Sequence, residues 1–107
     1  MTDIRQARKA LVARVLEGDG VASHIHRRAA FDNTELSRPV STLIEKVVHH
    51  ADTVIDEDVL TVCASGLSED QIFELVVCAA IGQAERQYDT ALVALDLAAT
   101  DTASGRG

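Results

Sequence analysis

The chain has 107 residues, 47% of them hydrophobic, and its 17 acidic and 10 basic residues give a formal net charge of −7. This length fits one domain, and the acidic balance argues against nucleic-acid binding, which needs basic surface to neutralise phosphates. Two cysteines are too few for a disulfide framework, and no apolar run is long enough to span a membrane, so we expect a reduced, cytoplasmic protein with no membrane partner.

The first predicted helix covers residues 3–17, where apolar residues recur at helical spacing among arginines and a lysine. Basic residues concentrate in this part of the chain. Residues 1–28 hold six basic and three acidic residues, whereas residues 29–107 hold four basic and 14 acidic ones. We expect the two parts to attract each other, within one chain or between subunits. The alternative is that the basic N-terminal helix docks an acidic protein partner.

Gly18, Asp19 and Gly20 end this helix. A second, shorter apolar stripe predicts a helix over residues 21–31, followed by a polar loop over residues 32–35. A third helix is expected to begin with Ser37 as its N-cap and Pro39 in its first turn. The apolar residues between 40 and 51 then fall on one narrow face, which is typical of an amphipathic helix.

A fourth helix is predicted from the acidic run at residues 56–58, because acidic side chains favour a helix N-terminus. Gly66 is expected to end it in a left-handed conformation. The next helix begins at once, since Ser68 and Gln71 have the spacing of a capping box, and Leu67 and Ile72 that of a hydrophobic staple.

The fifth predicted helix continues to about residue 98, and residues 72–81 are apolar on nearly every side. Such a helix must be covered on every side, so we expect either a central helix or one that also faces another subunit, and we expect the protein to be a homo-oligomer. Gly82 is expected to allow close contact with a neighbouring helix. The small and polar residues from 100 to 107 predict a disordered tail, which leaves one all-helical domain over residues 1–99.

Three residues are candidates for a catalytic site: His50, Cys63 and Arg86. His50 could act as a base if an oligomer brought it into a cleft, although surface exposure is favoured for it and for His49, which can pair with Glu45 one turn earlier. The two cysteines lie in apolar surroundings, which favours packing over a redox role. Arg86 needs a carboxylate or carbonyl partner, or could bind a ligand anion.

No metal site is expected. His24 and His26 would point apart on a helix, as would His49 and His50, and no third ligand has suitable spacing. The sequence also has no glycine-rich phosphate loop and no nucleophile motif, so we expect no cofactor.

From Pro39 to Leu95 the chain resembles the carboxymuconolactone decarboxylase and alkylhydroperoxidase D-like family. Three strings carry the resemblance, together with Arg86: residues 44–47, residues 54–59 and residues 64–75, the last of which is similar to the family's Gly-x-Ser-x-x-x-Ile turn between helices. The resemblance implies an all-helical fold of about five helices in an orthogonal bundle, and a homo-oligomer.

The peroxidase branch of that family carries a Glu-x-x-Cys-x-x-Cys-x-x-x-His signature, to which neither Cys63 nor Cys78 can be matched. We therefore expect a non-peroxidatic relative that acts as an oligomeric accessory, binding or assembly protein. The alternative is an enzyme of the same fold, either a thiol-dependent antioxidant (hydroperoxidase) or a lactone decarboxylase-type catalyst.

Overall fold

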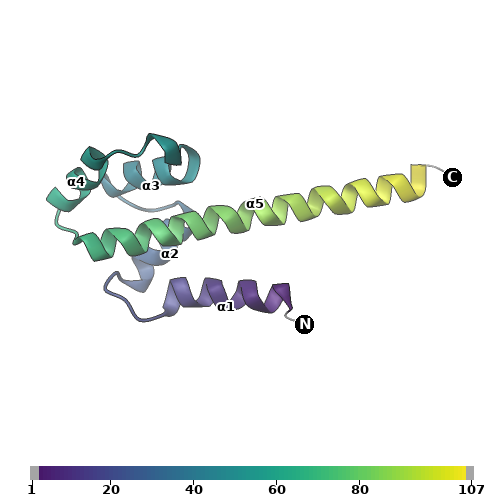
Figure 1. Ribbon diagram of the computed structural model, residues 1–107, viewed down its shortest axis with the longest axis horizontal. Helices are drawn as coiled ribbons and strands as arrows, with labels where there is room; N and C mark the ends of the chain where they lie inside the picture. The colour runs from purple at the N-terminus through teal and green to yellow at the C-terminus, as the bar shows by residue number, and fades with distance from the viewer. Residues whose placement is uncertain (1–2, 106–107) are drawn as a thin grey trace.

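The computed structural model describes residues 3–105, and within this range the protein is helical, with no strand. Five α-helices and one short 3-10 turn follow one another along the chain (Figure 1). The predicted all-helical class is therefore confirmed. None of the described helices combines the length and the apolarity that a membrane span requires.

The first two helices begin and end at residues suited to those positions. Helix α1 (Ile4–Glu17) is capped by the Asp3 side chain, which accepts a hydrogen bond from the Arg5 amide, and it ends at Gly18. Helix α2 (His24–Asp32) is capped by Ser23 and ends at Asn33 in the left-handed conformation. The second helix thus begins later than the predicted range of 21–31, because residues 18–23 form a loop.

Helix α3 (Val40–His49) corrects one prediction. Pro39 occupies its N-cap position, and no side chain caps the helix. Ser37 contributes its carbonyl oxygen, which accepts the Ser41 amide, and its hydroxyl takes no part. The helix is followed by a short 3-10 turn, η1 (Ala51–Thr53).

The junction between the last two helices has the predicted form. Helix α4 (Asp56–Ala64) starts with its three acidic residues and is followed by Gly66 at a φ of 115°. Helix α5 (Glu69–Gly105) starts with reciprocal bonds, in which the Gln71 amide donates to Ser68 Oγ and the Ser68 amide donates to Gln71 Oε1. Asp58 makes a related contact at the start of α4 by accepting the Ile55 amide at 2.9 Å.

Helix α5 is longer than predicted. We expected the ordered domain to end at residue 99 and a disordered tail to follow, but the helix continues to Gly105; residues 106–107 lie outside the described part of the chain. Adding residues to an existing helix costs little compared with starting one, and alanine is the best helix former. The alanine-rich run before residue 100 can therefore carry the helix into the polar segment.

The helices form a body around the first half of α5, while its second half extends alone (Figure 1). Helix α1 lies beside α5 and runs antiparallel to it, since Arg8 contacts Glu85 and Val15 contacts Cys78. Helix α2 packs against the same part of α5. Principal extents of 62 × 30 × 22 Å reflect the extended helix.

Close contact between α2 and α5 depends on Gly82, as predicted. A Cβ atom at this position would lie 2.8 Å from the Phe31 carbonyl carbon and would overlap the carbonyl oxygen. That oxygen also accepts a hydrogen bond from Arg86 Nη1 at 2.6 Å. One peptide of α2 is therefore held directly against the backbone of α5.

The core consists of two adjoining groups of buried side chains, one between α2, α3 and α5 and the other between α3, α4 and α5. Their members are Ala22, Ala30, Ile44, Val48, Leu75, Cys78 and Ala79 in the first, and Leu43, Val62 and Ile72 in the second. Aliphatic residues and one cysteine fill both groups. Such small side chains allow the close approach seen at Gly82.

A single chain does not cover the apolar start of α5 on every side, so of the two predicted arrangements the fully enclosed central helix is wrong for one chain. Ile72 and Leu75 are buried, but Phe73 is 67% exposed and Ala80 is also exposed. Only the part of the helix that faces the other four helices is covered.

Candidate functional site

A half-open cleft of about 510 Å³ lies between α1, the loop after α1, and the first half of α5. Its lining mixes apolar and charged side chains: Leu11, Arg14, Val15, Gly18, Asp19, Arg27, Phe73, Glu74, Val77 and Cys78. Ligand sites are typically concave, mostly apolar and supplied with a few polar groups. The cleft is therefore the best candidate for a functional site in the described part of the chain.

Arg27 is the most unusual residue of the cleft, because it is charged and only 3% exposed. Its Nη1 donates to the Gly18 carbonyl at 2.7 Å, and its Nε donates to the Ala22 carbonyl at 3.1 Å. Its Nη2 has no partner among the described residues, and no carboxylate there forms an ion pair with it. This guanidinium group has no direct counter-charge. Since no fully buried side-chain nitrogen or oxygen among the described residues lacks a hydrogen-bond partner, Nη2 lies where the solvent of the cleft can reach it.

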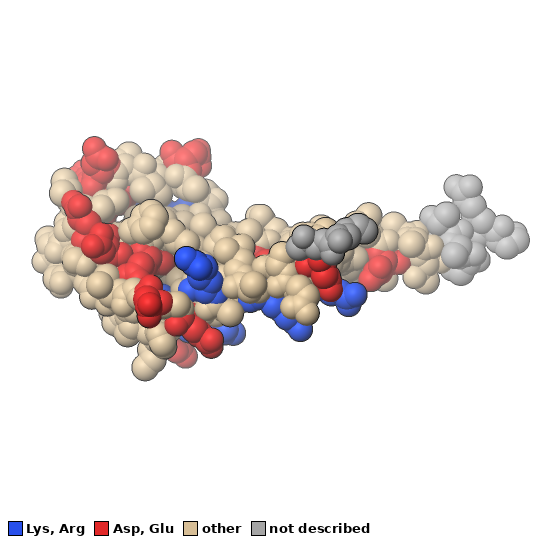
Figure 2. All heavy atoms as spheres, turned by 60° about the horizontal axis from the view of Figure 1, so that its bottom comes forward, with Lys and Arg blue, Asp and Glu red and all other residues tan. Residues whose placement is uncertain are grey.

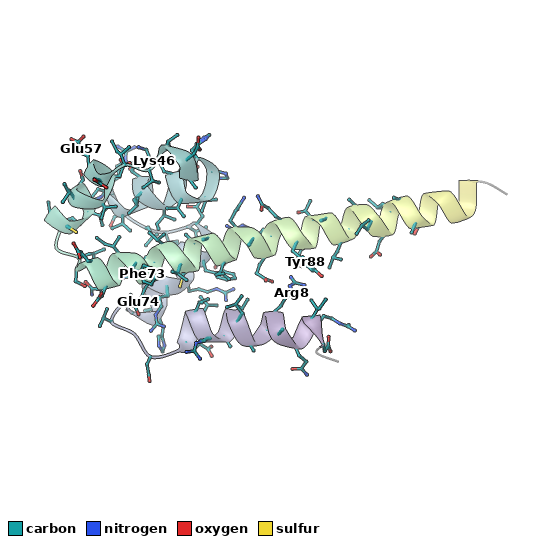
Figure 3. The ribbon with its side chains drawn as sticks, viewed as in Figure 1. Arg8, Lys46, Glu57, Phe73, Glu74 and Tyr88 are labelled. Carbon is teal, nitrogen blue, oxygen red and sulfur yellow. The ribbon has the colours of Figure 1, made fainter. Side chains whose placement is uncertain are left out.

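Glu74 fixes the loop beside Arg27. Its carboxylate accepts the Val21 amide at 2.9 Å and the Ala22 amide at 3.0 Å (Figure 3 shows its place on α5). A Cβ atom at Gly20 would collide with this carboxylate, so the missing side chain of glycine makes room for it. Glu74 and Arg27 are thus joined through the Ala22 peptide rather than through a direct ion pair.

Cys78 forms part of the cleft wall and is 1% exposed. Its thiol donates a hydrogen bond to the Val15 carbonyl at 3.2 Å. Burial raises the pKa of this thiol, with a smaller opposing effect from the nearby Arg27 charge. Since the thiolate is the nucleophile, the neutral Cys78 is suited to packing, as its sequence surroundings predicted.

The three predicted candidates lie in separate surroundings. His50 is exposed at the end of α3, Cys63 is half-buried on α4 beside the Val62 group, and Arg86 lies on α5. None of them lines the cleft, nor a smaller cavity of about 260 Å³ between α2 and the segment before α3. Neither of these two cavities therefore brings the three candidates together.

Arg86 and Glu45 have the structural contacts expected of them. Arg86 donates to the Phe31 carbonyl and, through Nε and Nη2, to Gln83 Oε1, so a carbonyl rather than a carboxylate is its main partner. Glu45 lies 3.5 Å from His49 Nε2 on the exposed side of α3. No cluster of potential metal ligands occurs among the described side chains.

A second polar contact joins α1 to the middle of α5. Arg8 Nη2 lies 2.7 Å from Glu85 Oε2 and 2.8 Å from Asp89 Oδ1, and its guanidinium carbon lies 4.0 Å from the centre of the Tyr88 ring (Figure 3). Hydrogen bonds to Glu85 first, and then to Asp89, raise the pKa of Arg8. Basic N-terminal and acidic C-terminal parts of the chain therefore do attract each other within one molecule.

Sequence reasoning missed Arg27 and Glu74, the two residues that organise the cleft. Arg27 stands next to Arg28, which is exposed and pairs with Asp32 one turn later. Nothing in the local pattern separates the two arginines. The two glycines flanking Asp19 marked a loop, but they did not show that a carboxylate 53 residues later would bind its amides.

Comparisons of the chain with protein-family models, with curated protein sequences and with solved structures gave no match.

Proposed function

We propose that this protein is a self-assembling, non-catalytic accessory protein and that its subunits associate through the second half of α5. One observation carries the proposal: every residue from 87 to 100 is exposed. This stretch includes large apolar side chains that are 40% to 65% exposed, namely Tyr88, Leu92, Val93, Leu95 and Leu97. By helical spacing Tyr88, Leu92 and Leu95 share one face of α5, and exposed apolar faces of this kind mark interaction sites in soluble proteins.

The extended helix also needs support. From residue 90 to residue 99, no hydrogen bond, ion pair or core group joins α5 to another helix. Most of the stability of a helix within a protein comes from the packing of one face against other elements. In Figure 2 this part of the helix is mostly uncharged surface. Covering its side chains with another helix would supply the missing stabilisation, at about 1.5–3 kcal/mol for each large apolar side chain that becomes fully buried.

Charge favours a second copy of the chain as the covering partner. Asp96 is exposed on the projecting half of α5, and no basic residue occurs between 87 and 100. On α1, Arg5 and Lys9 are exposed outside the cleft. Two antiparallel copies of α5 would bring the projecting half of each toward the body of the other, where these basic side chains lie.

We also propose that the five helices form the orthogonal bundle that the family resemblance implies. The order α3, α4, α5 and the glycine turn with its Ser68 cap support a carboxymuconolactone decarboxylase-like and alkylhydroperoxidase D-like bundle. A homo-oligomer is what that resemblance implies. The enzymatic alternative has less support, because neither described cavity is lined by His50, Cys63 or Arg86.

The test compares two variants that each add one negative charge at an exposed helical position. Leu95→Glu changes the proposed interface, and Thr42→Glu changes α3. Leu95→Glu should weaken self-association at least about 100-fold, which corresponds to about 3 kcal/mol, and should leave the body folded. Thr42→Glu should associate like the wild type. Equal association of all three proteins by sedimentation equilibrium would contradict the proposal.

A further inference from the structure

The cleft between α1 and α5 takes no part in the proposed self-assembly. It contains the largely buried guanidinium group of Arg27, whose Nη2 has no protein partner among the described residues and is open to solvent. It also contains the exposed Arg14, which forms no ion pair among the described residues. Both cations border a space of about 510 Å³, well within the size of small-molecule sites.

The acidic residues of the cleft do not neutralise Arg27. Both oxygens of Glu74 accept loop amides, and Glu74 is not within ion-pair distance of any described cation. Asp19 is exposed on the loop. A bound anion would give Arg27 a direct counter-charge and a hydrogen-bond acceptor, in the charge-assisted geometry that guanidinium groups form with carboxylates.

The rest of the lining suits an apolar group. Phe73 is 67% exposed and Leu11 is 43% exposed, while Val15 and Val77 are half-buried beside them. A ligand with an apolar chain would cover these side chains and remove their surface from water. Phe73 projects from the first half of α5, apart from the half proposed to join two chains (Figure 3).

We propose that this cleft binds a small amphipathic monocarboxylate, with its carboxylate at Arg27 and Arg14 and its apolar chain against Phe73, Leu11 and Val77. A single negative charge fits better than a phosphate dianion, because Asp19 and Glu74 also border the cleft and would repel additional charge. Cys78 contributes apolar wall and takes no covalent part.

The experiment titrates the full-length protein with octanoate, with 1-octanol and with inorganic phosphate, followed by calorimetry and by NMR of backbone amides and arginine side chains. Octanoate should bind at least about tenfold more tightly than 1-octanol, and phosphate should not compete with it. The largest shifts should fall on Arg27 and on residues 73–77. Equal binding of 1-octanol, or shifts centred elsewhere, would overturn the proposal.

A matched pair of variants tests the location without disturbing the buried arginine. Phe73→Glu places a carboxylate at the cleft, and Leu60→Glu makes the same change at a 64% exposed position on α4, outside the cleft lining. Phe73→Glu should weaken octanoate binding at least about tenfold, while Leu60→Glu should bind like the wild type. Unchanged binding by Phe73→Glu would refute the site. Leu95→Glu should retain octanoate binding, which separates this inference from self-assembly.

Discussion

The contact between α2 and α5 predicts that replacing Gly82 by alanine destabilises the protein, although alanine is the better helix former. The new Cβ atom would lie 2.8 Å from the Phe31 carbonyl carbon and 3.0 Å from its Cα, and it would overlap the carbonyl oxygen. A backbone group cannot rotate aside as a side chain can. Helix α2 would therefore have to shift, and the 2.6 Å bond from Arg86 to the same oxygen would weaken.

The size of the effect follows from two opposing contributions. Overpacking a well-packed core costs about 1–3 kcal/mol, and a backbone obstacle places this substitution near the upper end. Replacing glycine by alanine within a helix returns about 1 kcal/mol. Gly82→Ala should therefore lower the free energy of unfolding by about 2 kcal/mol, or the melting temperature by about 8–16 °C for a domain of this size.

Urea denaturation at one fixed protein concentration measures this change, since association alters apparent stability. The control is the opposite substitution, Ala80→Gly, at an exposed position of the same helix. It should cost about 1 kcal/mol through helix propensity alone. If Gly82→Ala and Ala80→Gly both lower the free energy of unfolding, helix propensity alone cannot explain the two results, because it would stabilise one variant and destabilise the other. The loss in Gly82→Ala would then come from packing. A gain of about 1 kcal/mol in Gly82→Ala would show that α2 does not lie against this glycine.

Three further predictions concern the caps and carboxylates. Ser68→Ala should lower the free energy of unfolding by about 1 kcal/mol in thermal denaturation through loss of a cap, whereas Ser37→Ala should have little effect; equal losses would contradict the assigned caps. Glu74→Gln should speed hydrogen exchange at the amides of residues 21 and 22, and unchanged exchange would show that the carboxylate does not hold the loop. A hydrogen bond from the Ile55 amide, and to a smaller extent one from Lys46, lowers the pKa of Asp58 below its ordinary value of 3.8. The ionised Asp58 therefore stabilises the folded protein above pH 3.8, and this stabilisation is lost as the pH falls through the pKa of Asp58 in the folded state. Asp58→Asn should reduce the fall in melting temperature that accompanies a decrease in pH over this acidic range. An unchanged dependence of the melting temperature on pH would contradict the contact.

The helices that could be predicted were those whose ends are specified by neighbouring residues. Asp3 and Gly18 bound α1, while Gly66, Ser68 and Gln71 fix the junction between α4 and α5. These signals act over three or four residues, so the sequence displays them directly. Gly82 was predictable for a related reason, since a glycine among alanines in a helix favours close packing.

What failed to follow from the sequence depends on tertiary structure. Ser37 has the residue type of a cap, but the turn at Pro39 starts α3 later. The burial of Arg27 and the binding of loop amides by Glu74 arise only when α2 and α5 meet. The candidates His50 and Cys63 were chosen by residue type alone, which says nothing of whether they share a pocket.

The self-association of α5 is tested most directly by measuring the solution mass of the wild-type protein by sedimentation equilibrium over a range of micromolar concentrations. We expect a mass of at least two chains that falls on dilution, accompanied by a loss of far-ultraviolet helical signal as the unsupported end of α5 frays. A constant mass of 11.5 kDa, with an unchanged helical signal, would mean that the exposed helix stands alone and that a second copy does not cover it.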